Sequence, residues 1–258
     1  MISKSWLFNL QDALAFFTRL VKPHDPKSLD FFTKLSLLPL VGLILGLIIA
    51  GATYILHIIL ANSSIHPLVS SFLCAWLWLA LEIYLTRALH WDGVADLGDA
   101  LGSGHLGPKF WEILHDSRLG SFGAIALSLT LLGQLLAIAA HISHNNWHII
   151  FAAPLWARLA PLWLAKNLAP HPSSKLATSL VSQVNKDKRT YFLAKILLVA
   201  LPILLGLNFT AILIIIAQLF LIKKLQALAK LVGGLSGDFL GASIELSQLT
   251  FLFVSLIT

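Results

Sequence analysis

The sequence predicts an all-α, polytopic integral membrane protein, and three observations support this prediction. Hydrophobic residues make up 57% of the 258 residues and charged residues only 12%, which is about half of the usual share in soluble domains. Apolar runs of about 20 residues, the length that crosses a bilayer as a helix, recur along most of the chain. Every second connector between these runs contains no Lys or Arg. A large soluble helical bundle is the alternative, but a surface in water needs more charge than this.

The elements follow in order from this pattern. Residues 5–21 predict a short amphipathic helix at the membrane interface, ended by Pro23 and Pro26. About seven membrane-spanning helices follow, and six to eight are compatible with the pattern. Their predicted ranges are 34–60, 67–88, 121–143, 148–166, 190–206, 209–226 and 239–258. The fifth and sixth are short and are joined by a tight turn. All belong to one predicted membrane domain, 1–258, in which 1–33 is the interfacial, cytoplasmic N-terminal segment.

The basic residues predict an orientation in the membrane. Three connectors contain no Lys or Arg, and the connectors between them hold most of these residues; the three are 61–66, 144–147 and 207–208. The predicted location is the bacterial cell (inner) membrane. With seven spans, this pattern places the N-terminus on the cytoplasmic side and the C-terminus on the outside. The active region is then expected to face the cytoplasm. The net charge of +6 indicates basic loops facing anionic lipid rather than a nucleic-acid partner.

A run of carboxylates directly follows the second predicted span. Asp92, Asp96 and Asp99 are spaced i, i+4 and i+7 and therefore share one face of a helix. Carboxylates this close repel one another unless a cation lies among them, and Mg²⁺ prefers their oxygens. The three are therefore predicted metal ligands in a cytoplasmic catalytic segment, 87–120. The alternative is a solvent-exposed helix in a loop, on which the three carboxylates have no specific function. His90, beside the run, is a candidate for proton transfer.

Two glycine-rich turns precede further spans on the same side. Asp116 in the first turn and Asp238 in the second are predicted as additional metal ligands, although Asp238 is equally suited to cap the last span. The first turn also offers a planar guanidinium and the start of a helix, where backbone N–H groups favour anions. The residues predicted to bind phosphate there are Ser117, Arg118, Gly120 and Gly123. An ordinary interface turn with a helix cap is the alternative.

Three charged residues fall inside or near the predicted spans: Glu82, Arg158 and Glu245. Such groups are costly in lipid and usually face a bundle interior or a cavity. Arg158 is a candidate substrate-binding residue, and a structural ion pair with either glutamate is the alternative.

Five motifs, in this order over most of the chain, resemble those of the cobalamin synthase family, adenosylcobinamide-GDP ribazoletransferase. They are Phe17-Thr-Arg19 with the basic, proline-containing stretch behind it, Leu38-Pro-Leu-Val-Gly42, the segment 89–99, the segment 112–123 and the segment 237–245. The chain departs from the family pattern at three places. The usual His-Leu-Asp-Gly-Leu-Ala-Asp reads His-Trp-Asp-Gly-Val-Ala-Asp at 90–96, Arg87 replaces the Gly of a usual Thr-Gly, and Gln248 stands where Glu is common.

The resemblance implies the last step of nucleotide-loop assembly in cobalamin biosynthesis. A hydroxyl of α-ribazole, or of its 5′-phosphate, attacks the cobinamide-side phosphorus of adenosylcobinamide-GDP, and GMP leaves as adenosylcobalamin or its 5′-phosphate forms. Mg²⁺ on the pyrophosphate would be held by Asp92, Asp96 and Asp99 with Asp116 or Asp238. Arg118 and Arg19 would offset phosphate charge. An Asp or His90 would take the proton.

Two other functions compete with this interpretation. A CDP-alcohol phosphotransferase also uses clustered Asp on membrane helices, but its Asp-Gly-x-x-Ala-Arg signature is not matched here. An ion-coupled transporter would use the three charged residues of the spans, but the sequence has no clear inverted repeat and its acids cluster at one face. A homo-oligomer is left open.

Overall fold

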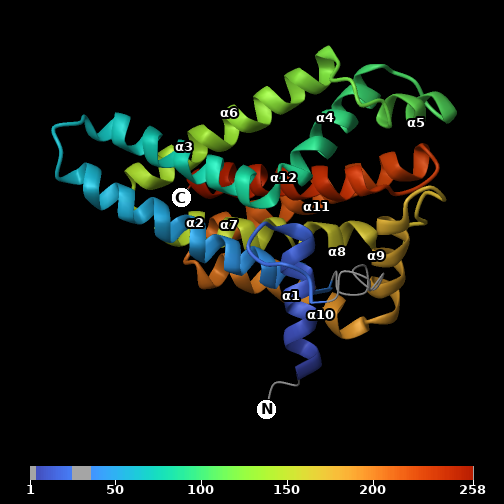
Figure 1. The fold of residues 1–258 in the computed structure, drawn as a ribbon, viewed down its shortest axis with the longest axis horizontal. Coiled ribbons are helices and arrows are strands. Elements are labelled where there is room, and N and C mark those ends of the chain that lie inside the picture. The colour runs from blue at the N-terminus through green and yellow to red at the C-terminus, as the bar shows by residue number, and fades with distance from the viewer. Residues whose placement is uncertain (1–3, 25–35, 258) are drawn as a thin grey trace.

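The computed structural model describes residues 4–24 and 36–257, and the elements it forms there are the helices α1 to α12 and short turns (Figure 1). Six helical segments are long and apolar enough to cross a membrane. They are α2 (Leu38–Ala61), α3 (Pro67–Thr86), α6 (Ser121–Ser143), α7 with α8 (Trp147–Ala165), α11 (Asn208–Leu231) and α12 with its last turn (Gly237–Ile257). The prediction of a polytopic helical membrane bundle is confirmed. The start of the first span, predicted at residue 34, lies outside the described residues.

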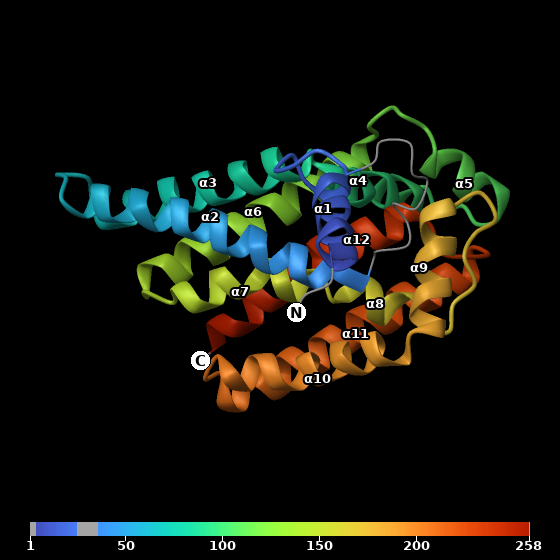
Figure 2. The ribbon, with the colours of Figure 1, turned by 60° about the horizontal axis from the view of Figure 1, so that its bottom comes forward.

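The remaining predicted span, 190–206, forms α10 (Lys188–Leu204), which has 17 residues and is shorter than the six helical segments that are long enough to cross a membrane. It lies antiparallel beside α11 (Figure 2), and the predicted tight turn joins them, with Gly206 at φ 74°. By length there are therefore six candidate spans in the described residues, which is within the predicted range of six to eight.

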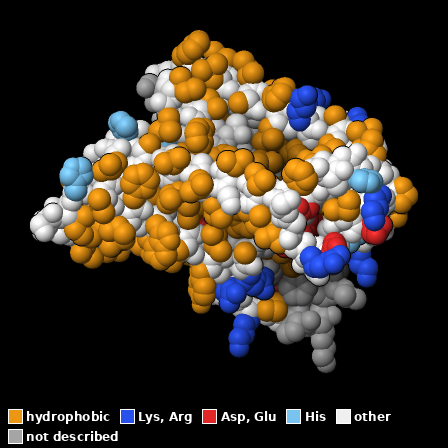
Figure 3. Space-filling view, turned by 90° about the horizontal axis from the view of Figure 1, so that it is seen from above, with side chains coloured by type: hydrophobic (Ala, Val, Ile, Leu, Met, Phe, Trp, Pro, Cys, Tyr) orange, Lys and Arg blue, Asp and Glu red, His pale blue; other side chains and the backbone are white. Residues whose placement is uncertain are grey.

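The long helices run roughly along one axis, and their ends differ in chemistry. The turns 62–66, 144–146 and 205–207 lie at one end together with the C-terminus (Figure 2). The other end, which we call the polar end, consists of residues 87–120, 166–187 and 232–236. It carries α4 (Leu89–Gly102), α5 (Pro108–Leu114) and α9 (Lys175–Lys186). In Figure 3 acidic and basic side chains gather toward this end, whereas the opposite tip shows hydrophobic and His side chains.

Close helix packing in the middle of the bundle depends on two glycines of α2. A Cβ atom at Gly42 would lie 2.3 Å from the carbonyl oxygen of Pro154, and one at Gly46 would lie 2.3 Å from that of Phe151. Any larger side chain would therefore push α2 away from α7 (Trp147–Ala157). The small-xxx-small pair in the first span thus has the structural role that this pattern commonly has in membranes.

A sharp turn separates α3 from α4. Arg87 and Ala88 both adopt the left-handed region, with φ of 59° and 57°, and this ends one helix and starts the next in a new direction. Residues with a Cβ atom adopt this conformation at a cost of about 1–2 kcal/mol. The Arg87 guanidinium donates to the carbonyl oxygens of Ala15, at 3.2 Å, and Phe16, which offsets part of that cost.

The N-terminal helix α1 (Lys4–Phe17) lies crosswise to the spans (Figures 1 and 2) and ends four residues earlier than the predicted 5–21. The chain leaves it along α3, because the Arg19 amide donates to the carbonyl oxygen of Leu85 at 2.7 Å. Asp12 of α1 is buried and accepts from the amide of His24 at 2.8 Å. α1 is therefore fixed against the α3–α4 turn.

Candidate active site

The site forms where α4 crosses α12 (Gly237–Val254) with very little space between their backbones. A Cβ atom at Gly93 would lie 2.5 Å from the carbonyl oxygen of Asp238, and one at Gly241 would lie 3.3 Å from the Cα of His90. These two glycines let the helices approach until Asp92 of α4 and Asp238 of α12 border the same space. The sequence placed both in glycine-rich motifs, but not against each other.

A cavity of about 170 Å³ opens beside this crossing. Its polar side chains are His90, Asp92 and Asp238. Its apolar walls come from the end of α1, the start of α2, α8 (Ala160–Ala165), α9 and α12. The cavity thus combines two carboxylates and an imidazole with an extensive hydrophobic lining.

Asp96 lies one helical turn after Asp92 and is half-buried. Its pKa is raised to about 7, first by burial and then by the negative charges of Asp92, Asp238 and Asp99. All the charged groups that shift this pKa are carboxylates. Among the described residues, the α4–α12 crossing therefore places negative charges around Asp96 that no Lys or Arg pairs with, and a bound cation would stabilise them.

Asp99 has a different environment from the other two aspartates of α4. Its carboxylate accepts the backbone N–H groups of Gly120, at 2.7 Å, and Gly123, at 2.8 Å, at the start of α6. A Cβ atom at either glycine would lie 2.3 Å from an Asp99 oxygen. The amides predicted to bind phosphate are thus bound by Asp99, which caps α6 from 21 residues away.

Asp116 and Arg118 bind each other rather than the separate partners that the sequence suggested. Arg118 Nη2 lies 2.7 Å from Asp116 Oδ2, and Nε lies 3.0 Å from Oδ1. Hydrogen bonds from the Arg118 side chain and amide lower the pKa of Asp116 to about 2. The Arg118 side chain is 87% exposed, and Ser117 beside it is exposed too. Neither Asp116 nor Arg118 lines the cavity.

His90 is buried in the cavity wall. No hydrogen-bond partner for its Nε2 occurs within the described residues. Burial, and then the charge of Arg158, lowers the pKa of His90 well below its usual value, so the imidazole is neutral at physiological pH. Asp238 accepts a hydrogen bond from Ser236 Oγ at 2.9 Å and lies in the first turn of α12, while Ser236 holds the cap position.

Arg19 lies at the outer edge of the polar end. Its guanidinium carbon is 5.0 Å from the centre of the Tyr84 ring, and the residue is exposed. It does not line the cavity, although Phe17, two residues before it, does.

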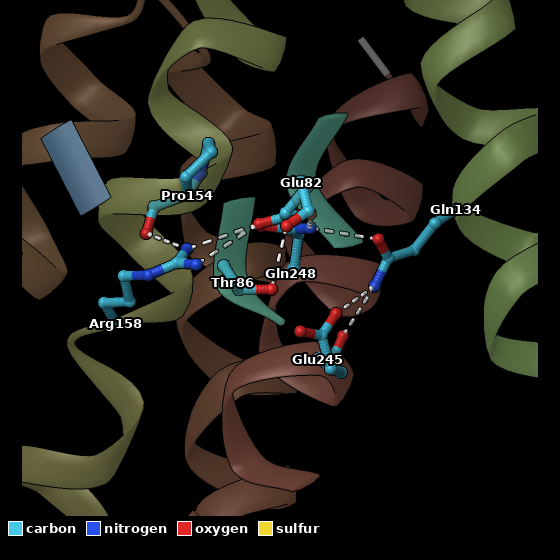
Figure 4. A network of polar contacts seen from close by, with 7 residues as sticks. All are labelled: Glu82, Thr86, Gln134, Pro154, Arg158, Glu245 and Gln248. Carbon is cyan, nitrogen blue, oxygen red and sulfur yellow. Dashed lines mark hydrogen bonds and ion pairs between the residues drawn. The ribbon is translucent and has the colours of Figure 1, made fainter. Parts of the chain in front are cut away.

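Arg158 is enclosed in the bundle, far from solvent (Figure 4). Its two terminal nitrogens lie 3.4 Å from Glu82 Oε1, and Nη1 also donates to the carbonyl oxygen of Pro154 at 3.1 Å. Both charged side chains are at most 1% exposed. Of the two roles left open for Arg158, the structure shows the ion pair, and its partner is Glu82.

Two glutamines extend this pair into a network that sequence reasoning did not find. Gln248 donates to Glu82 Oε2 at 2.7 Å and to Gln134 Oε1 at 3.0 Å (Figure 4). Gln134 in turn donates to Glu245 Oε2 at 3.1 Å. An amide at position 248 can donate to both acceptors, which a carboxylate cannot. The signal available in the sequence was the presence of glutamines in otherwise apolar spans.

A complete metal centre is not preformed. Within the described residues, no group of three or more His, Cys, Asp or Glu is placed to hold a metal ion. The carboxylates around the cavity are instead Asp92 and Asp238 on its wall, with Asp96 close enough to be shifted by both.

The fold and the site define a polytopic membrane protein with an apolar cavity at one end of its bundle, bordered by two carboxylates that form no salt bridge within the described residues. The sequence matches the model of the cobalamin-5-phosphate synthase family over residues 9–256, so the chain belongs to that family. The resemblance predicted from the motifs is confirmed, and neither the CDP-alcohol phosphotransferase nor the transporter is favoured.

Similar proteins cover nearly the whole chain. The adenosylcobinamide-GDP ribazoletransferase of Nitratidesulfovibrio vulgaris (strain DP4) is 34% identical over 237 residues, 90% of each chain. A protein with the same name from Desulfitobacterium hafniense (strain Y51) is 33% identical over 93% of each chain. Another from Brevibacillus brevis is 31% identical over 94% of this chain and 95% of its own length. No solved structure matches the chain.

Proposed function

We propose that this chain joins α-ribazole, or its 5′-phosphate, to adenosylcobinamide-GDP and releases GMP, forming adenosylcobalamin or its 5′-phosphate. Membership of the family and the names of the relatives support the reaction. The structural observation that carries the proposal is the cavity at the α4–α12 crossing, where Asp92 and Asp238 border an apolar space. A phosphoanhydride needs a charged, well-positioned clamp, and the aromatic base of the acceptor needs a hydrophobic wall.

Mg²⁺ is the proposed cofactor, and the oxygen donors of Asp92, Asp96 and Asp238 fit it. This ion commonly binds one or two carboxylates, several waters and the substrate phosphates, so it does not need three preformed protein ligands. When bound, it would neutralise charge on the pyrophosphate. Asp99 and Asp116 already accept hydrogen bonds from α6 and Arg118 and contribute little to this set.

The protein residues position the reactants and receive the proton. The acceptor hydroxyl oxygen bonds to the cobinamide-side phosphorus, the bond from that phosphorus to the bridging oxygen breaks, and GMP leaves with the electron pair. The proton of the hydroxyl passes to His90, whose Nε2 has no partner in the described residues, or to an aspartate. The apolar walls limit the entry of water, which would otherwise hydrolyse the anhydride.

Two arginines are proposed to offset phosphate charge once they exchange partners. Arg118 would leave Asp116 for a phosphate, and because both are exposed, the exchange takes place in water. Arg19 would move from the face of Tyr84. Arg118 lies on the polar end, and Arg19 lies next to it, where its amide binds Leu85 at the end of α3.

The direct test is GMP release by purified protein given adenosylcobinamide-GDP, α-ribazole and Mg²⁺. GMP should form only when both substrates and the metal are present. Absence of GMP with every divalent metal tried would overturn the proposal.

A variant tests the cavity itself. Leu180 of α9 lines the cavity wall and is 1% exposed. Leu180→Trp should raise the KM for α-ribazole at least about tenfold, since filling the hydrophobic wall removes binding area. The KM for adenosylcobinamide-GDP should change less; an equal change in both would place the acceptor elsewhere.

We also propose that the polar end faces the cytoplasm across the inner membrane, because the connectors at the opposite end lack Lys and Arg. Gly104→Cys introduces a thiol in an exposed turn of the polar end, while the native Cys74 is buried. A membrane-impermeant maleimide should label it in inverted vesicles but not in intact cells. Labelling in intact cells alone would reverse the orientation.

A further inference from the structure

A second, chemically different pocket lies on the polar end between α8, α10 and α11. It has a volume of about 180 Å³, and its lining includes three lysines and three neutral polar residues. These are Lys166, Lys223 and Lys230 with Asn167, Tyr191 and Gln226. Within the part of the chain that the structure describes, no Asp or Glu lines it. Pro161 at the start of α8 borders the carboxylate cavity and Lys166 just after α8 borders this pocket, so the two are separate sites.

The helices hold the lysines together. Lys223 and Lys230 are seven residues apart on α11 and therefore share one face, two turns apart. Gln226 lies between them and donates to the carbonyl oxygens of Trp163, Leu164 and Lys166 at 3.2–3.4 Å. The C-terminal carbonyls of α8, the negative end of a helix, are thereby satisfied by an amide instead of repelling an anion from the pocket.

The charges of these lysines are not balanced by neighbouring carboxylates. The salt bridges formed among the described residues are Lys109–Glu112, Arg118–Asp116 and Arg158–Glu82, and none involves the pocket. Lys166 donates to Asn185 Oδ1 at 3.2 Å and lies 5.2 Å from the centre of the Tyr191 ring. Three ammonium groups around one small polar space favour an anion between them.

The position of the pocket along α11 matches the edge of a membrane. Lys223 and Lys230 lie 15 and 22 residues after Asn208 at the opposite end of the helix, about 22 and 33 Å along the axis, and thus on either side of the hydrocarbon thickness of about 30 Å. The outward side chains between Asn208 and Lys223 are apolar and exposed, including Phe209 at 72%, Ile216 at 59% and Phe220 at 63%. The lysines thus begin where the lipid-facing apolar surface ends, at the depth of the headgroups.

We propose that this pocket binds the phosphate group of an anionic membrane lipid. The phosphate oxygens would accept hydrogen bonds from the lysines, and the acyl chains would follow the exposed apolar side of α11. A free phosphate of a soluble nucleotide has the same recognition chemistry. The continuity of the pocket with an apolar, outward-facing helix surface favours the lipid.

The test measures lipid binding by the full-length protein in detergent, using native mass spectrometry with phosphatidylglycerol and with phosphatidylcholine as probes. Phosphatidylglycerol should bind at least about tenfold more tightly than phosphatidylcholine. Lys223→Gln and Lys230→Gln should each remove most of this preference. Lys224→Gln is the matched control, because Lys224 is the neighbour of Lys223 on α11 and carries the same charge but does not line the pocket.

Three outcomes would overturn the proposal. Equal binding of the two lipids removes the headgroup charge from recognition. An equal loss in Lys224→Gln shows diffuse attraction to the surface rather than a pocket. Displacement of phosphatidylglycerol by millimolar GDP or inorganic phosphate, but not by salt at the same ionic strength, assigns the pocket to a free phosphate. All three readouts are independent of GMP release, so they do not depend on the proposed reaction.

Discussion

Two acid-rich regions lie close together in this molecule, and their carboxylates differ in the partners that the protein provides for them. In the bundle, Glu82 meets Arg158 and Gln248, and Glu245 meets Gln134. At the α4–α12 crossing, Asp92 and Asp238 border a cavity and raise the pKa of Asp96, and within the described residues neither forms a salt bridge with Lys or Arg. The first region pairs Glu82 with a cation inside the protein and gives one oxygen of Glu245 an amide donor, whereas the second offers its carboxylates to a cavity. The hydrogen-bond and ion-pair partners of each acidic side chain therefore distinguish structural acids from reactive ones better than the clustering of acids in the sequence does.

The largest expected effect comes from removing a carboxylate at the cavity. Asp92→Asn and Asp96→Asn should each lower the turnover number at least about 1,000-fold, since charge stabilisation by a metal is usually a dominant part of phosphoryl transfer. The thermal unfolding midpoint in detergent should hardly change for Asp92→Asn, and without metal above pH 7 it should rise for Asp96→Asn, which removes a half-buried charge among other carboxylates. Glu112→Gln, an exposed carboxylate of α5 paired with Lys109, is the control and should keep full activity. Full activity in either Asp variant would remove that residue from the site.

The bundle network should show the reverse result, with a loss of stability and little change in chemistry. Arg158→Met leaves Glu82 buried without its cation, and breaking a buried pair in this way costs about 3 kcal/mol or more. Reversible unfolding in mixed micelles measures the difference. The double variant Glu82→Gln with Arg158→Met should recover part of the loss. If turnover per folded molecule fell as steeply as in Asp92→Asn, Arg158 would belong to the reaction.

The raised pKa of Asp96 makes the cavity region sensitive to pH. The folded-state pKa of about 7 exceeds the reference value of 3.8, so in the absence of metal the free energy of unfolding should fall as pH rises through about 7. Metal binding requires the deprotonated form, so Mn²⁺ affinity should rise about tenfold from pH 6 to pH 8. Calorimetric titration at both pH values measures this rise, and Asp96→Asn should flatten it. A rise that persists in the variant would assign it to another group.

Asp99 combines features of the two regions. It belongs to the acidic run of α4, but its carboxylate accepts backbone hydrogen bonds and so has the environment of a structural acid. Asp99→Ala should destabilise the protein by about 1 kcal/mol through the lost cap on α6. Asp99→Asn keeps an acceptor oxygen and should retain most of the turnover, unlike Asp92→Asn. Thermal unfolding and GMP release measured on the same preparations distinguish these roles. A loss as complete as that of Asp92→Asn would make Asp99 a metal ligand after all.

Much of this arrangement was predictable from local sequence patterns. The lengths of the apolar runs predicted the spans to within a few residues, and the i, i+4, i+7 spacing placed Asp92, Asp96 and Asp99 on one helix. Contacts between distant segments were not predictable. The amides that bind Asp99 lie 21 and 24 residues away, the arginine that binds Glu82 lies 76 residues away, and no periodicity encodes such pairings. Local rules therefore identified the acids, and only the packing showed which of them are already satisfied.

The turn between the two regions provides the smallest and most specific test. Arg87 holds a left-handed φ of 59° and anchors α1 through the carbonyl oxygens of Ala15 and Phe16. Arg87→Gly relieves backbone strain but loses the anchor, so the free energy of unfolding should change by less than about 1 kcal/mol. Arg87→Ala loses the anchor and keeps the strain, and it should therefore be the less stable of the two by about 1 kcal/mol. Chemical unfolding of both variants measures this difference. Equal stabilities would mean that the left-handed conformation of residue 87 costs no measurable free energy. Since the turn sets the direction of α4 relative to α3, GMP release that falls in both variants while stability holds would show that this turn positions the cavity residues of α4 for the reaction.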